Sequence, residues 1–116
     1  MSIEEMVRGA VAFTGYPCAK TSYDGDACAY FVFRMDAIPE NHADDMPQHD
    51  RWLLQLHLFA PFTQNTRALR KQLREAISDA GFTYPAMVDA SETVRASDGT
   101  EQHLVFEFEV AAGVDE

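Results

Sequence analysis

The fold of this chain is decided by the block from Arg51 to Ala111, RWLLQLHLFAPFTQNTRALRKQLREAISDAGFTYPAMVDASETVRASDGTEQHLVFEFEVA. Apolar residues alternate along its two ends, which is the pattern of half-buried strands. The alternating positions are Trp52, Leu54, Leu56 and Leu58, and then Leu104, Phe106, Phe108 and Val110. Between them, apolar residues recur at helical spacing and stop at Gly81, where a left-handed residue would end a helix. These are Leu69, Leu73, Ala76, Ile77 and Ala80. The block predicts a strand over Arg51–Phe59, a helix over Thr66–Ala80 and a strand ending near Val110.

A further strand is expected before the last one, although its pattern is weak. Val88, Ala90, Glu92 and Val94 alternate only partly, and Ser97-Asp98-Gly99-Thr100 has the composition of a tight hairpin turn. The preceding helix is expected to begin after Pro61, with Thr63 or Asn65 as its N-cap.

The first half of the chain adds one helix and one strand. Ser2 and Glu5 have the spacing of a capping box, and a helical stripe of apolar residues follows. We expect a helix over Ile3–Thr14 that is closed by Gly15, a connecting loop over residues 18–26 and a strand over Ala27–Met35. A long acidic loop from Asp36 to Asp50 then leads into the next strand.

This order predicts a single α+β domain over residues 1–116. The elements follow one another as helix, strand, strand, helix, strand, strand (α-β-β-α-β-β). Their apolar positions share one sheet face, against which both helices can pack. These positions are Phe31, Phe33, Met35, Leu54, Leu56, Leu58, Leu104, Phe106 and Phe108. We therefore expect a two-layer sandwich with a four-stranded, mainly antiparallel sheet and two helices on one face.

Composition narrows the function classes. The 116 residues carry a formal net charge of −10, which argues against tight nucleic-acid binding because phosphate contacts need a positive field. No apolar run reaches the roughly 18 to 20 residues that span a bilayer, and the N-terminus lacks the features of a signal peptide. We expect a cytosolic protein without membrane contact, with Cys18 and Cys28 as reduced thiols.

The second sheet face carries polar residues of the kinds that form catalytic or metal-binding sites. His57 with Glu107 and Glu109 would form an acid–base or metal cluster if their strands are neighbours. A solvated face is the favoured interpretation, because no nucleophile, paired-carboxylate motif or Gly-rich phosphate loop accompanies them. The mixture of apolar and polar residues on this face is also typical of a subunit contact. The face consists of Tyr30, Arg34, Leu53, Gln55, His57, Phe59, Val105, Glu107 and Glu109.

The acidic loop contains other possible metal ligands, namely His42, Asp44, Asp45, His49 and Asp50. Their spacing matches neither a zinc nor an EF-hand pattern, and metal sites need ligands that the structure holds in place. We predict no catalytic, cofactor or metal site in this chain.

The helix over Thr66–Ala80 carries its basic residues near its N-terminus, which is the positive end of the helix dipole. Arg67, Arg70, Lys71 and Arg74 lie in its first half, where cations are unfavourable by roughly 0.3 to 1 kcal/mol each. A solvated basic face is one open interpretation. The other is a contact with an acidic surface of a neighbouring subunit. The interface candidates on the acidic side are Asp36, Glu40, Asp44, Asp45 and Asp50.

Four phrases of the sequence carry a family resemblance. They are Trp52-Leu-Leu-Gln-Leu-His-Leu-Phe-Ala60, the helix with Ala68-Leu69 and Leu73, Ala80-Gly81-Phe82, and Leu104-Val-Phe-Glu-Phe-Glu-Val110. Together they resemble the small tail-terminator proteins, also called tail-completion or minor tail proteins, of long-tailed bacteriophages and prophages. The resemblance covers roughly residues 28–110.

The resemblance implies a non-enzymatic structural protein without a cofactor. It implies a ring, commonly a hexamer, that caps the tail tube, ends its polymerisation and meets the head-side connector. The implied partners are other copies of the chain, the tail tube protein and the head–tail connector protein. The implied location is the host bacterial cytoplasm during assembly and then the virion tail. An acidic ring would also let DNA pass without holding it.

Two other function classes stay open. A small-molecule-binding α+β module of the ferredoxin-like kind, without catalytic activity, is the alternative, since fold does not decide function. An enzyme that uses His57 with Glu107 ranks third.

Overall fold

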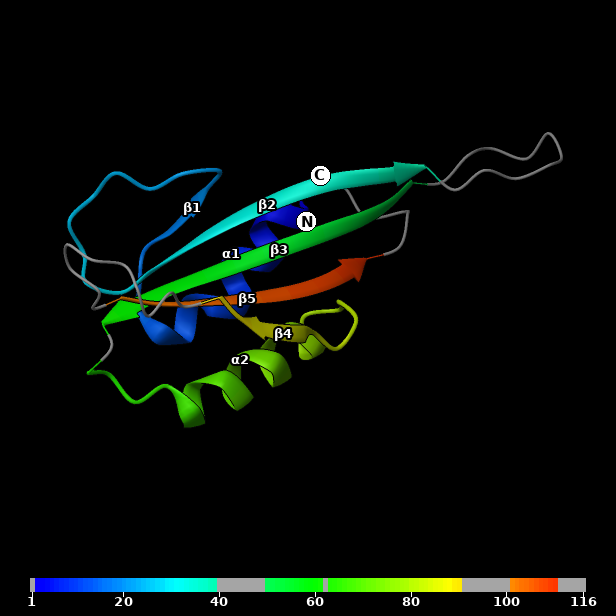
Figure 1. The fold of residues 1–116 in the computed structure, drawn as a ribbon. Coiled ribbons are helices and arrows are strands. Elements are labelled where there is room, and N and C mark those ends of the chain that lie inside the picture. The colour runs from blue at the N-terminus through cyan, green and yellow to red at the C-terminus, as the bar shows by residue number, and fades with distance from the viewer. Residues whose placement is uncertain (1, 40–49, 62, 91–100, 111–116) are drawn as a thin grey trace, which may run out of the picture.

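The computed structural model describes residues 2–39, 50–61, 63–90 and 101–110 (Figure 1). Two α-helices, a 3-10 turn and five strands follow one another along the chain. They are α1 (Ile3–Val11), η1 (Ala12–Thr14), β1 (Cys18–Lys20), β2 (Tyr30–Pro39), β3 (Asp50–Pro61), α2 (Arg67–Asp79), β4 (Ala86–Asp89) and β5 (Glu101–Val110).

The strands form one mixed sheet in the order β1-β2-β3-β5-β4. β1 runs parallel to β2, and the other three pairs are antiparallel. The prediction of a four-stranded, mainly antiparallel sheet with the order α-β-β-α-β-β is therefore wrong. The additional strand β1 lies within residues 18–26, which we expected to be a loop.

The sequence does not predict β1, because the hydrogen bonds that make it a strand involve residues outside the three that it contains. The carbonyl of Pro17 accepts a hydrogen bond from the Phe31 amide, and the Thr21 amide donates to the Phe33 carbonyl. The Arg8 side chain on α1 donates to the Cys18 carbonyl. A segment this short has no period of its own, so β2 and α1 determine that it is a strand.

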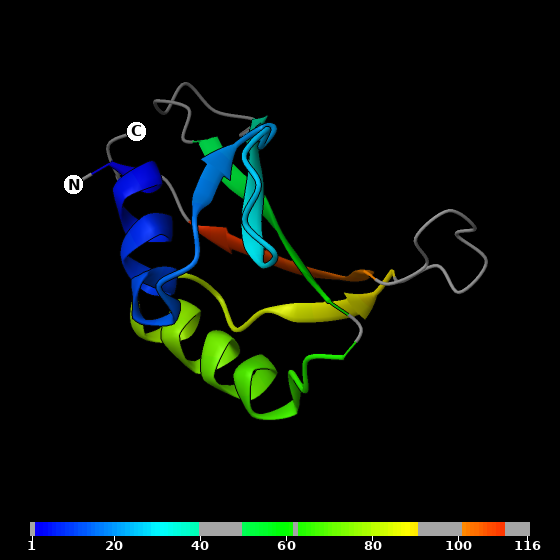
Figure 2. The ribbon, with the colours of Figure 1, turned by 90° about the vertical axis from the view of Figure 1, so that its left-hand side faces the viewer.

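The apolar face of the sheet packs against both helices, which lie on the same side of it (Figure 2). From the helices, Ile3, Val7, Leu73 and Ile77 are almost completely buried. The strand residues buried with them are Phe31, Phe33, Leu54, Leu56, Leu58, Leu104, Phe106, Phe108 and Val110. This single core leaves the other face of the sheet without a helix over it in the described part of the chain.

Helix ends follow the local signals in part. Ser2 and Glu5 form the capping box, with hydrogen bonds of 2.9 and 3.1 Å. Gly15 and Gly81 have φ values of +75° and +112°, which fit a residue without a Cβ at the end of a helix. The N-cap of α2 is Thr66, so the prediction of Thr63 or Asn65 at that position is wrong. The side chain of Asn65, one residue earlier, accepts a hydrogen bond from the Arg67 amide at 3.0 Å.

β2 and β3 extend further than the sequence suggests. Their pairing continues to Pro39 opposite Asp50, so residues 36–39 belong to a strand and not to the acidic loop. β2 also begins at Tyr30, three residues after the predicted start. Residues 40–49 of the predicted acidic loop lie outside the described residues, as does the predicted hairpin turn at 97–100.

A buried polar network fixes the beginning of α2. Thr66 and Gln102 are 3% and 7% exposed, and the Thr66 hydroxyl donates to the Gln102 side-chain oxygen at 3.0 Å. Gln102 Nε2 donates in turn to the carbonyls of Pro61 and Gln64. These bonds tie the segment before α2 to β5, since buried polar groups are costly without partners.

Both cysteines are free thiols, and burial raises the pKa of Cys18. Within the described residues, no helix combines the length and the apolar character that a bilayer span requires.

Candidate functional site

The uncovered sheet face, called the outer face below, is organised in rows that run across the strands. Its character changes from aromatic at one end to acidic at the other. Strand register places Tyr30, Phe59 and His103 in the first row, Val32, His57, Val105 and Val88 in the second, Arg34, Gln55, Glu107 and Ala86 in the third, and Asp36, Leu53 and Glu109 in the fourth.

A ladder of stacked rings occupies the aromatic end. Tyr23 from the connecting segment stacks on Tyr30, with ring centroids 4.5 Å apart, and Tyr30 stacks on Phe59 at 5.0 Å. His103 continues the ladder at 4.3 Å from Phe59, and His57 lies 5.0 Å from His103. Cross-strand aromatic pairs each add about 0.5 to 1.5 kcal/mol beyond the area they bury. The ladder therefore stiffens this end of the outer face.

The two histidines of the ladder bond directly to one another. His57 Nδ1 lies 2.7 Å from His103 Nε2, so one ring nitrogen must carry a proton and the other must accept it. Burial lowers the pKa of His57, and nearby His103 and Arg34 lower it further, whereas Glu107 raises it. A charged His57 is thus disfavoured in this structure as it stands.

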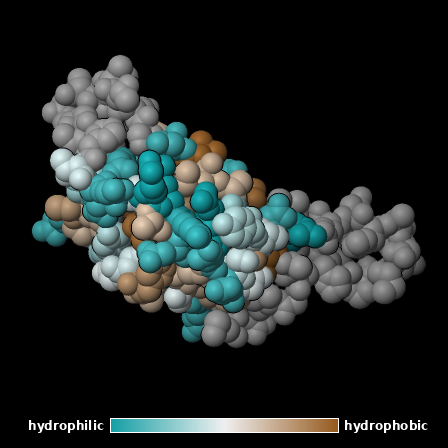
Figure 3. Space-filling view, turned by 90° about the horizontal axis from the view of Figure 1, so that it is seen from below, coloured by the Kyte–Doolittle hydropathy of each residue, from teal (hydrophilic) through white to brown (hydrophobic). Residues whose placement is uncertain are grey.

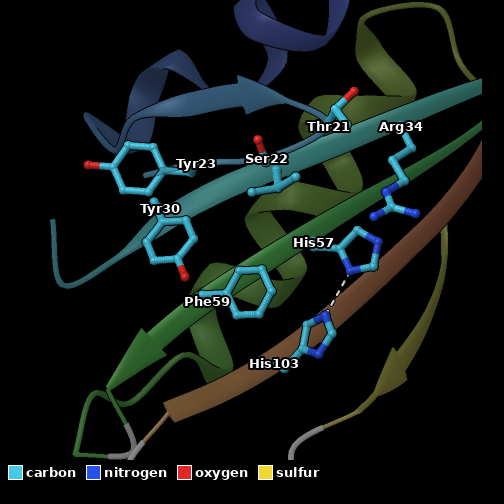
Figure 4. Close-up of a pocket in the computed structure, with 9 residues that line it drawn as sticks. Thr21, Ser22, Tyr23, Tyr30, Arg34, His57, Phe59 and His103 are labelled. Carbon is cyan, nitrogen blue, oxygen red and sulfur yellow. Dashed lines mark hydrogen bonds between the residues drawn. The ribbon is translucent and has the colours of Figure 1, made fainter. Parts of the chain in front are cut away.

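A hollow of about 330 Å³ opens beside the histidines (Figure 4). Thr21, Ser22 and Tyr23 form one wall, and Thr21 has a φ of +76°. A β-branched residue with positive φ costs about 1 to 3 kcal/mol, and such outliers are concentrated at functional sites. The residues that line the hollow are Thr21, Ser22, Tyr23, Tyr30, Val32, Arg34, His57, Phe59 and His103.

The predicted cluster of His57 with Glu107 and Glu109 does not form as a unit. His57 bonds to His103, while the Gln55 side chain donates to Glu107 at 3.0 Å and Arg51 pairs with Glu109 at 3.3 Å. Among the described residues, no group of three or more His, Cys, Asp or Glu side chains is arranged to hold a metal. Glu107 still lies close enough to His57 to influence its pKa.

The basic stripe on α2, defined as Arg67, Arg70, Lys71 and Arg74, lies on the helical side of the molecule. Figure 3 shows a predominantly hydrophilic surface on the side where α2 lies. Arg67 and Lys71 are exposed, whereas Arg70 and Arg74 are half-buried. Arg70 Nε donates to the Thr66 hydroxyl at 3.1 Å, and the buried Arg74 Nε has no hydrogen-bond partner in the described structure. No carboxylate of the described residues forms an ion pair with this stripe.

The acidic interface candidates are described only in part. Asp36 is exposed in the fourth row of the outer face, and Asp50 begins β3 opposite Pro39. Glu40, Asp44 and Asp45 lie outside the described residues, as do His42 and His49. The pairing of the basic stripe with an acidic surface stays a hypothesis.

Sequence reasoning missed His103 and Tyr23. His103 continues the alternation of Val105, Glu107 and Glu109, so extending that strand by two residues would have placed it on the outer face. Tyr23 reaches the ladder through the turn at Thr21, and no local signal in the sequence predicts such a turn at a threonine.

Comparisons with known proteins bear on the fold. No protein-family model matches the chain, and no curated protein matches it either. A chain in the solved structure of the virion of a native gene transfer agent particle has a similar fold, with a TM-score of 0.60 and 14% sequence identity. The match covers 96% of this chain and 91% of that chain, so this chain shares its architecture over almost the whole length.

Proposed function

We propose that this chain is a structural protein of a phage-like virion and acts as a tail terminator. The observation that carries the proposal is the fold shared with a gene transfer agent virion chain over 96% of this chain. The shared fold supports a virion component, and the sequence resemblance to tail-terminator proteins supports the terminator role. In this role the chain is non-enzymatic. It assembles in the host bacterial cytoplasm and ends in the virion tail.

The terminator role requires a ring of subunits, and the charge distribution supports one form of contact. A ring needs two different surfaces that meet in each subunit pair. The basic stripe on α2 lacks a carboxylate partner within the described structure, and Asp36, Glu40, Asp44, Asp45 and Asp50 supply a candidate acidic surface. We propose that these two sets meet between neighbouring copies, and that the ring in turn contacts the tail tube and the head–tail connector proteins.

A tube-assembly assay tests the terminator role directly. Purified chain is added to polymerising tail tube protein encoded beside it, and tube length is measured by electron microscopy. We expect shorter tubes with the chain bound at one end. Tubes of unchanged length without bound chain would contradict the proposal, and so would a gene that lies among metabolic genes only.

The ring contact is tested by charge reversal. The double variant Arg70→Glu and Arg74→Glu should lose ring-sized oligomers in native mass measurements at low and moderate salt. The four positive charges of the stripe become two positive and two negative charges, so the stripe no longer attracts an acidic surface. The double variant Glu75→Lys and Asp79→Lys, on the same helix but outside the stripe, is the matched control. An unchanged oligomer in the first variant would remove the basic stripe from the contact, while the tube assay would still report on the terminator role.

A small-molecule-binding module is the second candidate, favoured by the hollow on the outer face. It predicts a monomer or dimer that neither shortens tail tubes nor binds their ends.

A further inference from the structure

The hollow on the outer face brings one permanent cation beside two imidazoles. Arg34 on β2 is exposed, and no carboxylate among the described residues pairs with it. Its guanidinium group points toward His57, which in turn points toward His103 (Figure 4). Three neighbouring strands thus contribute one potential donor each to a single open site.

Among the described residues, one cation and one carboxylate, Arg34 and Glu107, act on His57 with opposite effects on its pKa. Glu107 on β5 is the carboxylate that acts on His57, and the Gln55 side chain holds it by a hydrogen bond. Asp36 lies one row further along the sheet. Tyr23 and Tyr30 contribute phenol groups to the lining of the hollow. An anion in the hollow would therefore be held better if the histidine pair accepted a proton.

The histidine pair can accept that proton. Protonation of the nitrogen that accepts the present hydrogen bond converts both ring nitrogens into donors, so the rings must turn apart and offer N–H groups elsewhere. Without an anion this step is opposed by burial and by Arg34. An anion beside the ring reverses the balance, because an opposite charge within about 4 to 6 Å favours the charged form.

The walls of the hollow also indicate what the anion is attached to. Phe59, Tyr30, Tyr23 and Val32 contribute apolar side chains to the lining, and Thr21 and Ser22 belong to its polar part. Ligand sites typically combine a mostly apolar lining with a few polar groups that fix orientation. Ring stacking holds Tyr23 and Tyr30 of this wall in place.

We propose that the hollow is a binding subsite for a carboxylate carried on an apolar or aromatic body, with Arg34 as the fixed cation and the His57–His103 pair as proton acceptor. Binding transfers one proton from the solvent buffer to a ring nitrogen of the pair, which forms one N–H bond, and changes no other covalent bond. The carboxylate could belong to a free organic acid or to an acidic side chain of a protein. The proposal goes beyond the tail role and does not depend on ring formation.

The test uses the full chain and two probes. Benzoate represents a free acid, with neutral benzamide as its isosteric control. A short synthetic peptide with blocked ends, in which one aspartate lies beside a phenylalanine, represents a protein source, because it carries a single carboxylate next to an aromatic body. Isothermal titration in two buffers of different ionisation enthalpy at about pH 7 measures affinity and proton uptake together, and histidine ring signals in NMR locate the site.

We expect benzoate or the peptide to bind with uptake of a proton, and to bind about tenfold more weakly to Arg34→Gln, which loses a charge-assisted hydrogen bond. The double variant His57→Gln and His103→Gln should lose the proton uptake. The variant Lys20→Gln, which removes a cation of β1 that pairs with Glu4 on α1, should bind as the native chain does. Tighter binding of benzoate assigns a free acid, and tighter binding of the peptide assigns a protein source.

Three outcomes would overturn the proposal. They are binding of benzamide as tight as that of benzoate, undiminished binding by Arg34→Gln, and the absence of binding in both arms. Circular dichroism of each variant establishes that a loss of binding does not reflect unfolding.

Discussion

The inner and outer faces of the same sheet place different demands on their residues. On the inner face, Phe31, Leu56 and Phe106 are completely buried, and any apolar side chain of suitable volume meets the requirement. On the outer face, the role of a residue depends on its neighbour on the next strand. His57 forms a hydrogen bond with His103, and Gln55 forms one with Glu107. The alternation of a strand therefore tells which residues share a face, but only register tells which residues meet on it.

The two faces should differ most in the free energy of unfolding that is lost when an aromatic ring is replaced by alanine. Phe106→Ala removes a fully buried ring and should lower the free energy of unfolding by about 3 to 5 kcal/mol, because a cavity forms in the core. Phe59→Ala removes a half-buried ring from the ladder and should cost about 1 to 2 kcal/mol, since it mainly loses stacking on Tyr30 and His103. Urea unfolding followed by the fluorescence of Trp52 measures both.

Phe106→Leu serves as a second core variant if the alanine variant does not fold, because it retains more of the side-chain volume. Equal losses for Phe106→Ala and Phe59→Ala would mean that the outer face is packed as tightly as the core. That result would contradict the distinction between the two faces.

Much of the inner face could be predicted from the sequence, because burial imposes a period on single residues. Alternation identified β3 and most of β5, and helical spacing identified α1 and α2. The capping box at Ser2 also formed as expected. These features depend on residues that are close in the sequence, so local patterns are sufficient.

The missed features all depend on distant partners. β1 exists because β2 and the Arg8 side chain pair with its backbone, and the Thr66–Gln102 bond joins residues 36 positions apart. The candidate site could be predicted only in part, for the same reason. A solvated face was the favoured interpretation, with a cluster of His57, Glu107 and Glu109 as the alternative, and the hydrogen-bond partner of His57 proved to be His103. No local pattern contains such pairings.

Acidification should weaken the outer face before it affects the core. The pKa of His57 is lowered below its ordinary 6.5 by burial, and then by His103 and Arg34. Just below this ordinary value the unfolded chain therefore binds a proton that folded His57 does not, so the free energy of unfolding falls as pH falls. Above about pH 6.5, where His57 is neutral in both the folded and the unfolded chain, this loss of stability is absent.

We expect a loss of no more than about 1 kcal/mol between about pH 7 and pH 5.5, because the pair is partly solvated and one neutral hydrogen bond is at stake. Urea unfolding at these pH values measures it. The double variant His57→Gln and His103→Gln supplies the background from other titrating groups. A native chain as insensitive to pH as this variant would show that the pair does not stabilise the outer face.

The smallest effect is expected at the acidic end of the outer face. Arg51 and Glu109 pair at 3.3 Å across β3 and β5, but both side chains are more than one third exposed. Solvent screening and side-chain entropy limit such pairs to about 0.2 to 1 kcal/mol. A double-mutant cycle with Arg51→Gln and Glu109→Gln isolates the coupling energy from each residue's other contacts. The coupling should decrease further at high salt, because exposed charges are screened. A coupling above about 2 kcal/mol that resists salt would mean that this end of the outer face is as shielded from water as the core.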